Sequence, residues 1–323
     1  MSQAEPKSTP MGTTRHADIK KNLVFRNKIQ GAVRQFFSDR GFIEVETPVR
    51  LTAPAPEPHI DAVDSGDHFL QASPELHMKR LLCAGYENIF QICKCFRQKE
   101  RGQFHLPEFT MLEWYVKGAD YRFLMDQTAA LIRHVSTRVL GGNHISYNNT
   151  SIDLSGEWRK IRIADAFEQY CGMSPQHALE NDMFEEKLAF EIEPRLDREH
   201  PIFLYDYPLE NTPLAAGVVN SPETAQRFEL YLAGIEICNG YTEMTNPEIQ
   251  QRRFMEELTA RKNENRPVYP LPTRFLNDMQ TMPNAAGCAL GLDRLIMILA
   301  DADAIDEVVA FVPEDDEDGA VKQ

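Results

Sequence analysis

One predicted hairpin of this 323-residue chain carries side chains that could do chemistry. The segment FRQKERGQFHLPEFTMLEWY, residues 96–115, places Arg97 at the end of an apolar strand, followed by a charged loop and a second strand. Alternate residues of a strand share a face, so Phe109, Glu113 and Tyr115 point the same way. An aromatic ring, a carboxylate and a phenol therefore line one surface. This surface is either a ligand site or a core strand whose glutamate pairs with an arginine.

A second predicted hairpin, residues 227–244, turns at Ala233-Gly234 and adds a pair of carboxylates. Regular pairing places Glu229, Tyr231, Glu236 and Cys238 on one face. The two glutamates would repel each other unless a divalent cation joined them, and Mg²⁺ prefers carboxylates together with phosphate oxygens. The alternative interpretation is an exposed, solvated pair.

A third group, Asn239, Tyr241 and Glu243, follows on the same predicted strand with the opposite parity. A regular strand cannot present both groups on one face, whereas a bulge can. Gly240 would permit such a bulge or a sharp twist, so we predict one there.

Two further segments contain small residues beside charged ones. The run Gly287-x-Ala289-x-Gly291-x-Asp293-Arg294 would let a ligand approach the backbone and offers a guanidinium for phosphate. It matches neither the P-loop nor the dinucleotide-binding pattern, and packing alone also explains it. The sequence Ser73-Pro74-Glu75 predicts a helix start that fixes Glu75 in place.

The remaining patterns predict the elements that hold these residues. Helical spacing begins at Asp18 and stops at Gly41, and a strand ending at Pro48 precedes a Pro-rich loop. Further helices are predicted over 120–140, 163–171, 182–197 and 247–264, with a strand over 201–207. Strands joined mostly by hairpins indicate an α+β fold with an antiparallel β-sheet flanked by helices. We expect a disordered leader over 1–17, one domain over 18–313 and an acidic disordered tail over 314–323.

Composition and charge exclude several classes of protein. The formal charge of −15 opposes extended contact with nucleic acid, which needs clustered Lys and Arg. No apolar stretch predicts a membrane span or a secretory signal, so we expect a cytoplasmic protein without membrane contact. The six cysteines contain no C-x-x-C, and we expect free thiols.

Taken together, these segments resemble the catalytic domain of class II aminoacyl-tRNA synthetases, most closely the lysyl-tRNA synthetase branch. The helix and strand ending at Pro48 resemble motif 1, which implies a homodimer interface. Residues 96–115 resemble motif 2, and the sequence GLDRL at 291–295 resembles motif 3. The resemblance implies a single catalytic domain, ATP and Mg²⁺ as cofactors, and formation of an aminoacyl-adenylate.

The resemblance also implies a role for each residue. Arg97 would bind the α-phosphate and the substrate carboxylate, Phe109 would stack on adenine, and Arg294 would bind the γ-phosphate, so that Arg97 and Arg294 are the implied catalytic residues. Glu100 and His105 would join the ATP site, and Glu229 and Glu236 would bind Mg²⁺. The implied pocket for an amino acid with two ammonium groups consists of Ser73, Glu75, Glu113, Tyr115, Asn239, Tyr241, Glu243 and Ala289.

Within this branch, the sequences SPELHMKRLL and GCALGLDR resemble the elongation factor P lysine ligases. That family lacks the anticodon-binding β-barrel and attaches lysine, preferably (R)-β-lysine, to a lysine side chain of elongation factor P. Ala289 stands where lysyl-tRNA synthetases carry glycine, and its methyl group fits a β-amino substrate. A neutral packing substitution is the alternative.

Two departures leave other functions open. Lys99 stands where the family has a glutamate, with Glu100 next, and Leu106 replaces the asparagine of the usual H-N-P-E-F loop. Both positions lie where adenine or the acceptor is read. Two competing hypotheses therefore remain. The protein is a non-catalytic dimer that senses an amino acid, or it is an enzyme with tRNA or another protein as acceptor.

Overall fold

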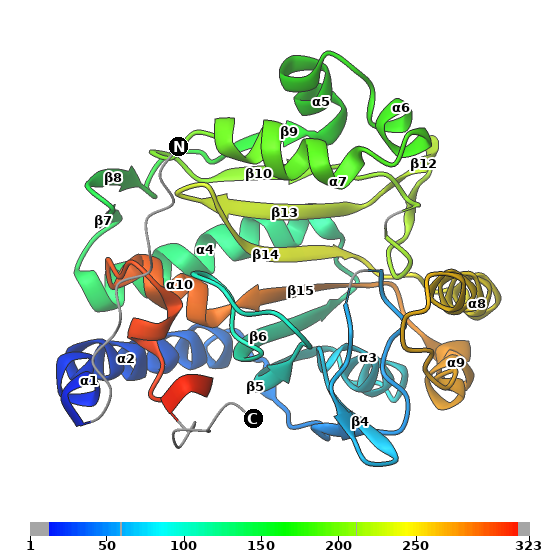
Figure 1. Ribbon diagram of the computed structural model, residues 1–323, viewed down its shortest axis with the longest axis horizontal. Coiled ribbons are helices and arrows are strands. Elements are labelled where there is room, and N and C mark those ends of the chain that lie inside the picture. Colours follow the sequence, from blue (N-terminus) through cyan, green and yellow to red (C-terminus); the bar gives the residue numbers. More distant parts are fainter. Residues whose placement is uncertain (1–12, 59, 211, 316–323) are drawn as a thin grey trace, which may run out of the picture.

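One large β-sheet runs through the centre of the protein (Figure 1). The computed structural model describes residues 13–58, 60–210 and 212–315, and within these ranges the sheet has eight strands in the order β1-β5-β6-β15-β14-β13-β10-β9. Neighbouring strands from β5 to β10 are antiparallel, whereas the edge strands β1 and β9 pair in parallel. The predicted α+β fold is confirmed, with the parallel edges as an addition. The strands of this sheet are β1 (Ile43–Glu44), β5 (Asn88–Phe96), β6 (Glu108–Lys117), β9 (Arg159–Arg162), β10 (Ile202–Tyr205), β13 (Arg227–Leu232), β14 (Ile235–Thr242) and β15 (Ala285–Gly291).

Helices and small sheets surround this central sheet. The α-helices are α1 (Thr13–Asp18), α2 (Lys20–Ser38), α3 (Glu75–Cys83), α4 (Tyr121–Leu140), α5 (Ile163–Cys171), α6 (Pro175–Glu180), α7 (Phe184–Lys187), α8 (Pro247–Asn263), α9 (Thr273–Asp278) and α10 (Leu292–Leu299). The small strands are β2 (Arg50–Leu51), β3 (Asp64–Ser65), β4 (His68–Leu70), β7 (His144–Tyr147), β8 (Thr150–Asp153), β11 (Gly217–Val218) and β12 (Ser221–Ala225). The helix predicted over 182–197 is in fact α7 followed by single turns of π- and 3₁₀-helix.

The sheet buries one face completely against α2, α4 and α10. Leu112 and Trp114 of β6 and Leu230 of β13 lie in this main hydrophobic core, with less than 1% of each side chain's surface exposed. Because side chains alternate along a strand, the residues between them project from the opposite face. Glu113 and Tyr115 therefore face away from the core, as the sequence predicts.

The opposite face is only partly covered. Helix α3 packs over β5 and β6, where Met78 and Leu82 contact Ile89 and Tyr115. At the other end, α5, α6 and α7 cover β10 and β13. Between these two groups of helices, residues of β6, β15, β14 and β13 line the cavity described below.

The hairpin of β13 and β14 contains a bulge, but not at the predicted residue. Leu230 pairs with Cys238 while the next residue, Tyr231, pairs with Glu236, so Ile237 is the extra residue. The prediction of a bulge at Gly240 is wrong, because Gly240 is regularly paired on both sides. Its lack of a side chain serves packing instead, since a Cβ there would lie 2.7 Å from the ring of Phe228.

The bulge changes which residues share a face. Regular pairing would have placed Cys238 beside Glu236, whereas Cys238 lies in the main core, on the opposite face. The predicted placement of Cys238 is therefore wrong. Asn239 now pairs with Glu229, so Asn239 and Glu236 both face the site. The two groups of opposite parity are brought together, as the sequence analysis required.

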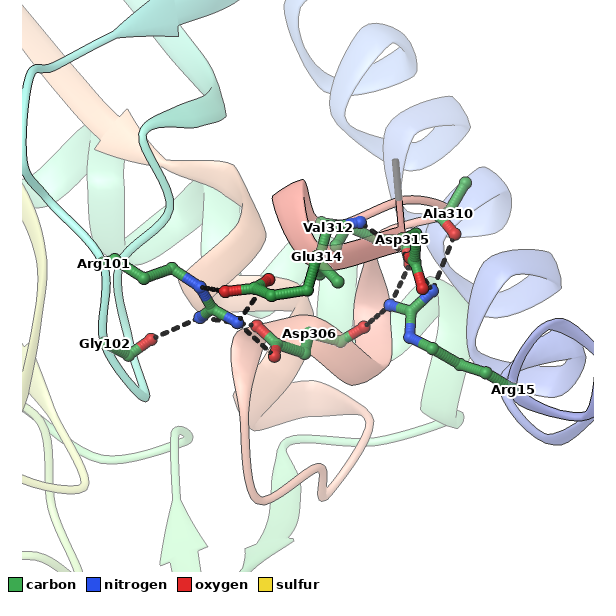
Figure 2. Close-up of polar contacts among 9 residues, drawn as sticks. Arg15, Arg101, Gly102, Asp306, Ala310, Val312, Glu314 and Asp315 are labelled. Carbon is green, nitrogen blue, oxygen red and sulfur yellow. Dashed lines mark hydrogen bonds and ion pairs between the residues drawn. The ribbon is translucent and has the colours of Figure 1, made fainter. Parts of the chain in front are cut away.

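Both ends of the described chain are anchored by arginines (Figure 2). Arg15, only 4% exposed, donates to the carbonyl oxygen of Asp306 at 2.6 Å and pairs with Asp315 at 2.9 Å. Arg101 pairs with Asp306 at 2.8 Å and with Glu314 at 2.9 Å.

These anchors correct two predicted boundaries. The leader predicted over 1–17 is wrong at residues 13–17, which belong to α1 and hold the buried arginine. The tail predicted to begin at 314 is wrong at residues 314–315, which form a 3₁₀-helical turn with two ion pairs. Residues 1–12 and 316–323 lie outside the described residues, so the rest of both predictions stays untested.

Two other predictions concern chemistry outside the site. All six cysteines are free thiols, as expected. None of the helices within the described ranges has the length and apolar character needed to cross a lipid bilayer.

Candidate functional site

A single cavity of about 310 Å³ opens on the uncovered part of the sheet. Its lining includes most of the predicted site residues: Ser73, Glu75, Arg97, Glu100, His105, Phe109, Glu113, Tyr115, Glu229, Glu236, Asn239, Tyr241, Ala289 and Arg294. Glu243 does not line the cavity but lies directly beneath it, ion-paired to Lys79. The two arginines that the sequence analysis placed in one site thus share one cavity. The roles assigned to these residues remain predictions.

Small residues of β15 give the cavity its depth. Ala289 lies between Glu113 on β6 and Asn239 on β14, so only its methyl group stands between the two polar side chains. Gly287 lies in the same way between Tyr115 and Tyr241. A Cβ on Gly287 would lie 2.2 Å from the Tyr115 ring and 2.7 Å from Oε1 of Glu243, so glycine is required here.

Arg97 lines the cavity with a guanidinium that is only partly engaged by the protein. Its side chain lies over the Phe109 ring, 5.2 Å from the ring centre, and its Nη1 is 3.7 Å from Oε1 of Glu100. Its Nε is buried and donates no hydrogen bond. A cationic group with an unsatisfied donor beside an aromatic face suits an anionic ligand that carries a planar ring.

The local backbone explains one departure from the family pattern. Lys99 has a φ of 64° and an exposed side chain. This left-handed residue turns the loop so that Glu100, one position later, lines the cavity beside Arg97. The carboxylate that this loop places in the cavity is therefore that of Glu100.

Arg294 contacts the motif 2 loop and β14 at once. It donates to the carbonyl oxygen and Oε2 of Glu236 at 2.8 and 3.1 Å, and to the carbonyl oxygen of Phe104 at 3.2 Å. Its Nη2 lies 2.5 Å from Nε2 of His105. The pKa of His105 is lowered, first by burial and then by Arg294, so the imidazole is neutral and accepts this hydrogen bond.

The end of the cavity next to α3 is acidic and contains one internal cation. The ammonium group of Lys79, only 3% exposed, lies 2.5 Å from both Oε1 of Glu75 and Oε2 of Glu243. Tyr241 donates a hydrogen bond to the same oxygen of Glu75. Three carboxylates share this end once Glu113 is included, so one lysine leaves an excess of negative charge when all are ionised.

Glu113 is held at the centre of the floor by two hydroxyl donors. Tyr115 donates to its Oε1 at 2.6 Å and Ser73 to its Oε2 at 2.8 Å. Ser73 also accepts from the backbone N–H of Glu75 at 3.0 Å, which ties Glu113 to the start of α3. Burial, followed by repulsion from Glu75, raises the pKa of Glu113 to about 8.

Glu243 titrates in the same range for a related reason. Burial raises its pKa to about 8, because the attraction of Lys79 only partly offsets the loss of water and the repulsion from Glu75. Its Oε1 accepts no hydrogen bond in the described structure. Two carboxyl groups that titrate near neutral pH, close to each other, favour a ligand that brings its own positive charge.

The predicted Mg²⁺ ligands differ in their availability. Glu229 accepts from Tyr207 at 2.6 Å and from Tyr231 at 2.9 Å on Oε2, and Arg227 binds its Oε1. Glu236 is paired through Oε2 with Arg294 alone, and 39% of its side chain is exposed.

The donor set fits Mg²⁺ if ATP completes it. Within the described ranges, no group of three or more acidic, His or Cys side chains could hold a metal ion by itself. Mg²⁺ commonly takes one or two carboxylates plus phosphate oxygens and water, so the accessible oxygen of Glu236 is the suitable protein ligand. Burial opposes ionisation of Glu236, but Arg294 outweighs it and lowers the pKa, so this carboxylate is ionised.

Sequence reasoning missed several cavity residues and close neighbours, of which four bear on the charge of the site. They are Glu57, which lines the cavity from the loop before β3, and Lys79, Tyr207 and Arg227, which contact the predicted carboxylates. Two signals were available: Lys79 is four residues after Glu75 on one helix, and Arg227 is two residues before Glu229 on one strand. Neither spacing reveals that the cation is buried.

Comparison with known proteins adds a family to this geometry. Residues 5–315 match the family described as tRNA synthetases class II (D, K and N). The chain belongs to this family. The predicted resemblance to class II synthetases is confirmed. The segment that resembles motif 2 forms the hairpin of β5 and β6.

Individual members of the class II family are similar over most of this chain. It is 34% identical over 308 residues to the elongation factor P–(R)-beta-lysine ligase of Edwardsiella ictaluri, covering 90% of this chain and 94% of that protein. It is 35% identical over 324 residues to the lysine–tRNA ligase of Thiobacillus denitrificans, covering 91% and 64%. It is 34% identical over 321 residues to the lysine–tRNA ligase 2 of Methanosarcina acetivorans, a match that covers 92% of this chain and 63% of that protein. The chain spans less than two thirds of the length of these two lysine–tRNA ligases.

Proposed function

We propose that the protein is an ATP-dependent ligase that activates lysine, preferably (R)-β-lysine, and transfers it to a lysine side chain of elongation factor P. The products are an amide bond, AMP and diphosphate. One observation carries this proposal: a single cavity joins the guanidinium of Arg97, whose Nε has no hydrogen-bond partner, and the ring of Phe109 to an end rich in carboxylates. Such a cavity suits a nucleotide beside an amino acid with two ammonium groups.

In the first step the substrate carboxylate attacks the α-phosphorus of ATP, and diphosphate leaves. Both reactants are anionic, so the protein must position them and reduce their repulsion. Arg97 can donate to the substrate carboxylate and the α-phosphate, while Phe109 stacks on adenine. Mg²⁺ bound through Glu236 would neutralise phosphate charge. A protein nucleophile is not required.

In the second step the neutral ε-amine of the acceptor lysine attacks the carbonyl carbon of the adenylate. The C–N bond forms, the bond to the phosphate oxygen breaks, AMP leaves, and the amine gives up a proton to solvent. An ordinary lysine has a pKa near 10.4, so few acceptor amines are neutral at pH 7. The acidic cavity wall raises rather than lowers that pKa, and the proposal assigns no catalytic base.

Two observations support the choice of substrate and acceptor. A relative named elongation factor P–(R)-beta-lysine ligase matches this chain over 94% of its own length. Ala289 places a methyl group between Glu113 and Asn239 on the cavity floor, which reshapes the space beside a substrate amino group. A change of one methyl in a pocket is worth roughly 1–3 kcal/mol of discrimination.

Two measurements test the proposal. Exchange of radiolabelled diphosphate into ATP should depend on added lysine or β-lysine, and β-lysine should give the higher kcat/KM. Intact-mass spectrometry of elongation factor P should then show the mass of one lysyl residue added. Absence of exchange with every diamino acid would refute adenylate formation, whereas exchange without modification of elongation factor P would refute only the acceptor.

A second candidate function is a protein that binds an amino acid without catalysis. It is favoured by Arg294, whose guanidinium is already bound to Glu236, Phe104 and His105 and must change partners to bind a phosphate. This candidate predicts thermal stabilisation by lysine with no diphosphate exchange.

We also propose that the protein is a cytoplasmic homodimer. Ile43 in the two-residue edge strand β1 is 52% exposed. Val49, which follows β1 in the sequence, is 40% exposed, and Tyr86, which precedes β5, is 41% exposed. Exposed apolar side chains around a sheet edge favour association with a second copy. Light scattering after size-exclusion chromatography should give twice the mass of 36.9 kDa.

A further inference from the structure

Glu57 lines the cavity but has no role in the function proposed above. It lies in the Pro-rich loop between β2 and β3 and lines the cavity together with Glu75, Arg97 and Arg227. Within the described residues its side chain makes no hydrogen bond or ion pair. In this respect it differs from the other acidic-end carboxylates, which are held by Lys79 or by hydroxyl groups.

The loop that carries Glu57 is held in place by a buried arginine. Arg261 of α8, with no exposed surface, donates to the carbonyl oxygen of Glu57 at 2.9 Å and to that of Ile60 at 3.0 Å. It also pairs with Asp61 at 2.6 Å. The planar guanidinium of Arg261 thus holds the backbone at Glu57 itself and at the residues that follow it. The carboxylate is therefore built into the cavity wall.

The same loop is joined to the start of the motif 2 loop. The backbone N–H of Gln98 donates to the carbonyl oxygen of Asp61 at 2.9 Å, next to Arg97. Glu57 and Arg97 therefore line the same cavity from two segments that this hydrogen bond joins. Its charged surroundings agree with this position, since burial and Glu75 raise its pKa to about 7 while Arg97, Lys79 and Arg227 oppose the rise.

We propose that the Glu57 carboxylate binds the substrate amino group that lies closest to the substrate carboxylate. This inference rests on the proposed function and adds a residue that determines specificity. Arg97 holds the carboxylate of the amino acid, so an amino group on the second or third carbon reaches the wall where Glu57 lies. The terminal amino group reaches Glu113 on the cavity floor. Glu57 is unpartnered because its partner is the ligand.

A ligand that lacks only this amino group gives a direct test. 6-Aminohexanoic acid keeps the chain length, the carboxylate and the terminal amine of both lysine (2,6-diaminohexanoic acid) and β-lysine (3,6-diaminohexanoic acid). Calorimetry would measure the binding of all three to the wild-type chain, Glu57→Gln and Glu57→Asp. Glu46→Gln is the matched control, because Glu46 lies outside this cavity.

The wild-type chain should bind the diamino acids roughly 10- to 100-fold more tightly than 6-aminohexanoic acid, the range expected for one charged hydrogen bond. Glu57→Gln should remove most of this difference by weakening only the diamino acids, Glu57→Asp should keep part of it, and Glu46→Gln should keep all of it. A Glu57→Gln chain that loses affinity for all three ligands equally, or for none, overturns the inference and leaves the proposed function intact.

The wild-type chain alone keeps the test decisive if Glu57→Gln does not fold. A wild-type difference of less than about twofold between lysine and 6-aminohexanoic acid means that no carboxylate binds this amino group, which overturns the inference. If the wild-type chain binds none of the three ligands, the proposed function falls together with it.

Discussion

Replacement of Lys79 by methionine should destabilise the protein in a manner that depends on pH. The ammonium group of Lys79 is 3% exposed and lies 2.5 Å from carboxylate oxygens of Glu75 and Glu243, whose side chains are 8% and 0% exposed. Methionine keeps the apolar stem but removes the charge, so two buried carboxylates lose their shared cation. Removing one partner of a buried pair costs about 3–5 kcal/mol.

The sign of the pH dependence follows from proton binding. In the wild-type chain, burial already raises the pKa of Glu243 to about 8, although Lys79 opposes the rise. Without Lys79 this pKa rises further, so the folded variant keeps a proton that the unfolded chain loses near pH 4.5. A group whose pKa is raised on folding contributes stability below its unfolded pKa, and this stability is lost as pH rises through the folded value. The loss should therefore be largest at alkaline pH.

Urea unfolding of Lys79→Met and the wild-type chain at two pH values measures this effect. We expect a loss of about 3–5 kcal/mol at pH 8.5 and about 1–2 kcal/mol at pH 5.5, where protonated carboxyl groups need no cation. Lys117→Met is the control, because Lys117 pairs with Glu87 at 2.8 Å on the exposed surface and should cost less than about 1 kcal/mol at either pH.

A second variant separates charge from packing. The double variant Lys79→Met, Glu243→Gln also removes one of the two carboxylates that lose their cation. We expect it to regain, at pH 8.5, about half of the unfolding free energy that Lys79→Met loses. A loss of equal size at both pH values would show that Lys79 acts by packing. A loss below about 1 kcal/mol at pH 8.5 would refute the interpretation of Lys79 as the internal cation of the site.

Three further predictions concern the ligand. Because the pKa of Glu113 is raised to about 8 and a diammonium ligand binds its ionised form, lysine affinity should fall by up to about tenfold per pH unit below pH 8. Calorimetry in buffers of different ionisation enthalpy should show that a proton is released on binding. Ala289→Gly should shift the kcat/KM ratio in diphosphate exchange toward α-lysine by about tenfold; an unchanged ratio would mean that the methyl group only packs. Arg97→Lys should lower the exchange rate by roughly 100-fold while changing the unfolding free energy by less than about 1 kcal/mol, because Nε of Arg97 holds no protein partner to strand.

Regular periodicity explains why much of the fold could be predicted. The alternation along β6 is unbroken, so the shared face of Phe109, Glu113 and Tyr115 followed directly from strand geometry. The helix start at Ser73 is signalled by the residue types that favour it, and the structure shows the expected bond from the Glu75 N–H.

The chain termini were less predictable because their order depends on distant partners. Arg15 belongs to a polar segment whose composition predicts disorder. In the structure it is buried against Asp306 and Asp315, which lie near the other end of the chain (Figure 2). Local composition contains no information about such a contact. The same limit applies to Glu314 and Arg101.

The bulge in β14 shows where a local signal misleads. The strand contains an irregularity, as the opposite parity of its two polar groups predicted. Glycine only permits a bulge, however, and Gly240 lacks a side chain because the Phe228 ring packs against it. The extra residue is Ile237, a good strand former with nothing in its type to indicate a bulge. The pairing of two strands decides its position, so it could be found only from the three-dimensional register.

The buried cations of the site determine which of its carboxylates are available to a ligand. The residue types predicted a group of glutamates that are all free to bind a dicationic ligand. In the structure, Lys79 neutralises part of the charge of Glu75 and Glu243. Arg227 forms an ion pair with Glu229. What remains for a ligand is Glu113, whose pKa is near neutral, and the carboxylate of Glu57. Selectivity for two ammonium groups therefore depends on the few carboxylates that the protein leaves without a cation, and a variant that frees another, such as Lys79→Met, should bind a more highly charged polyamine better than the wild-type chain does.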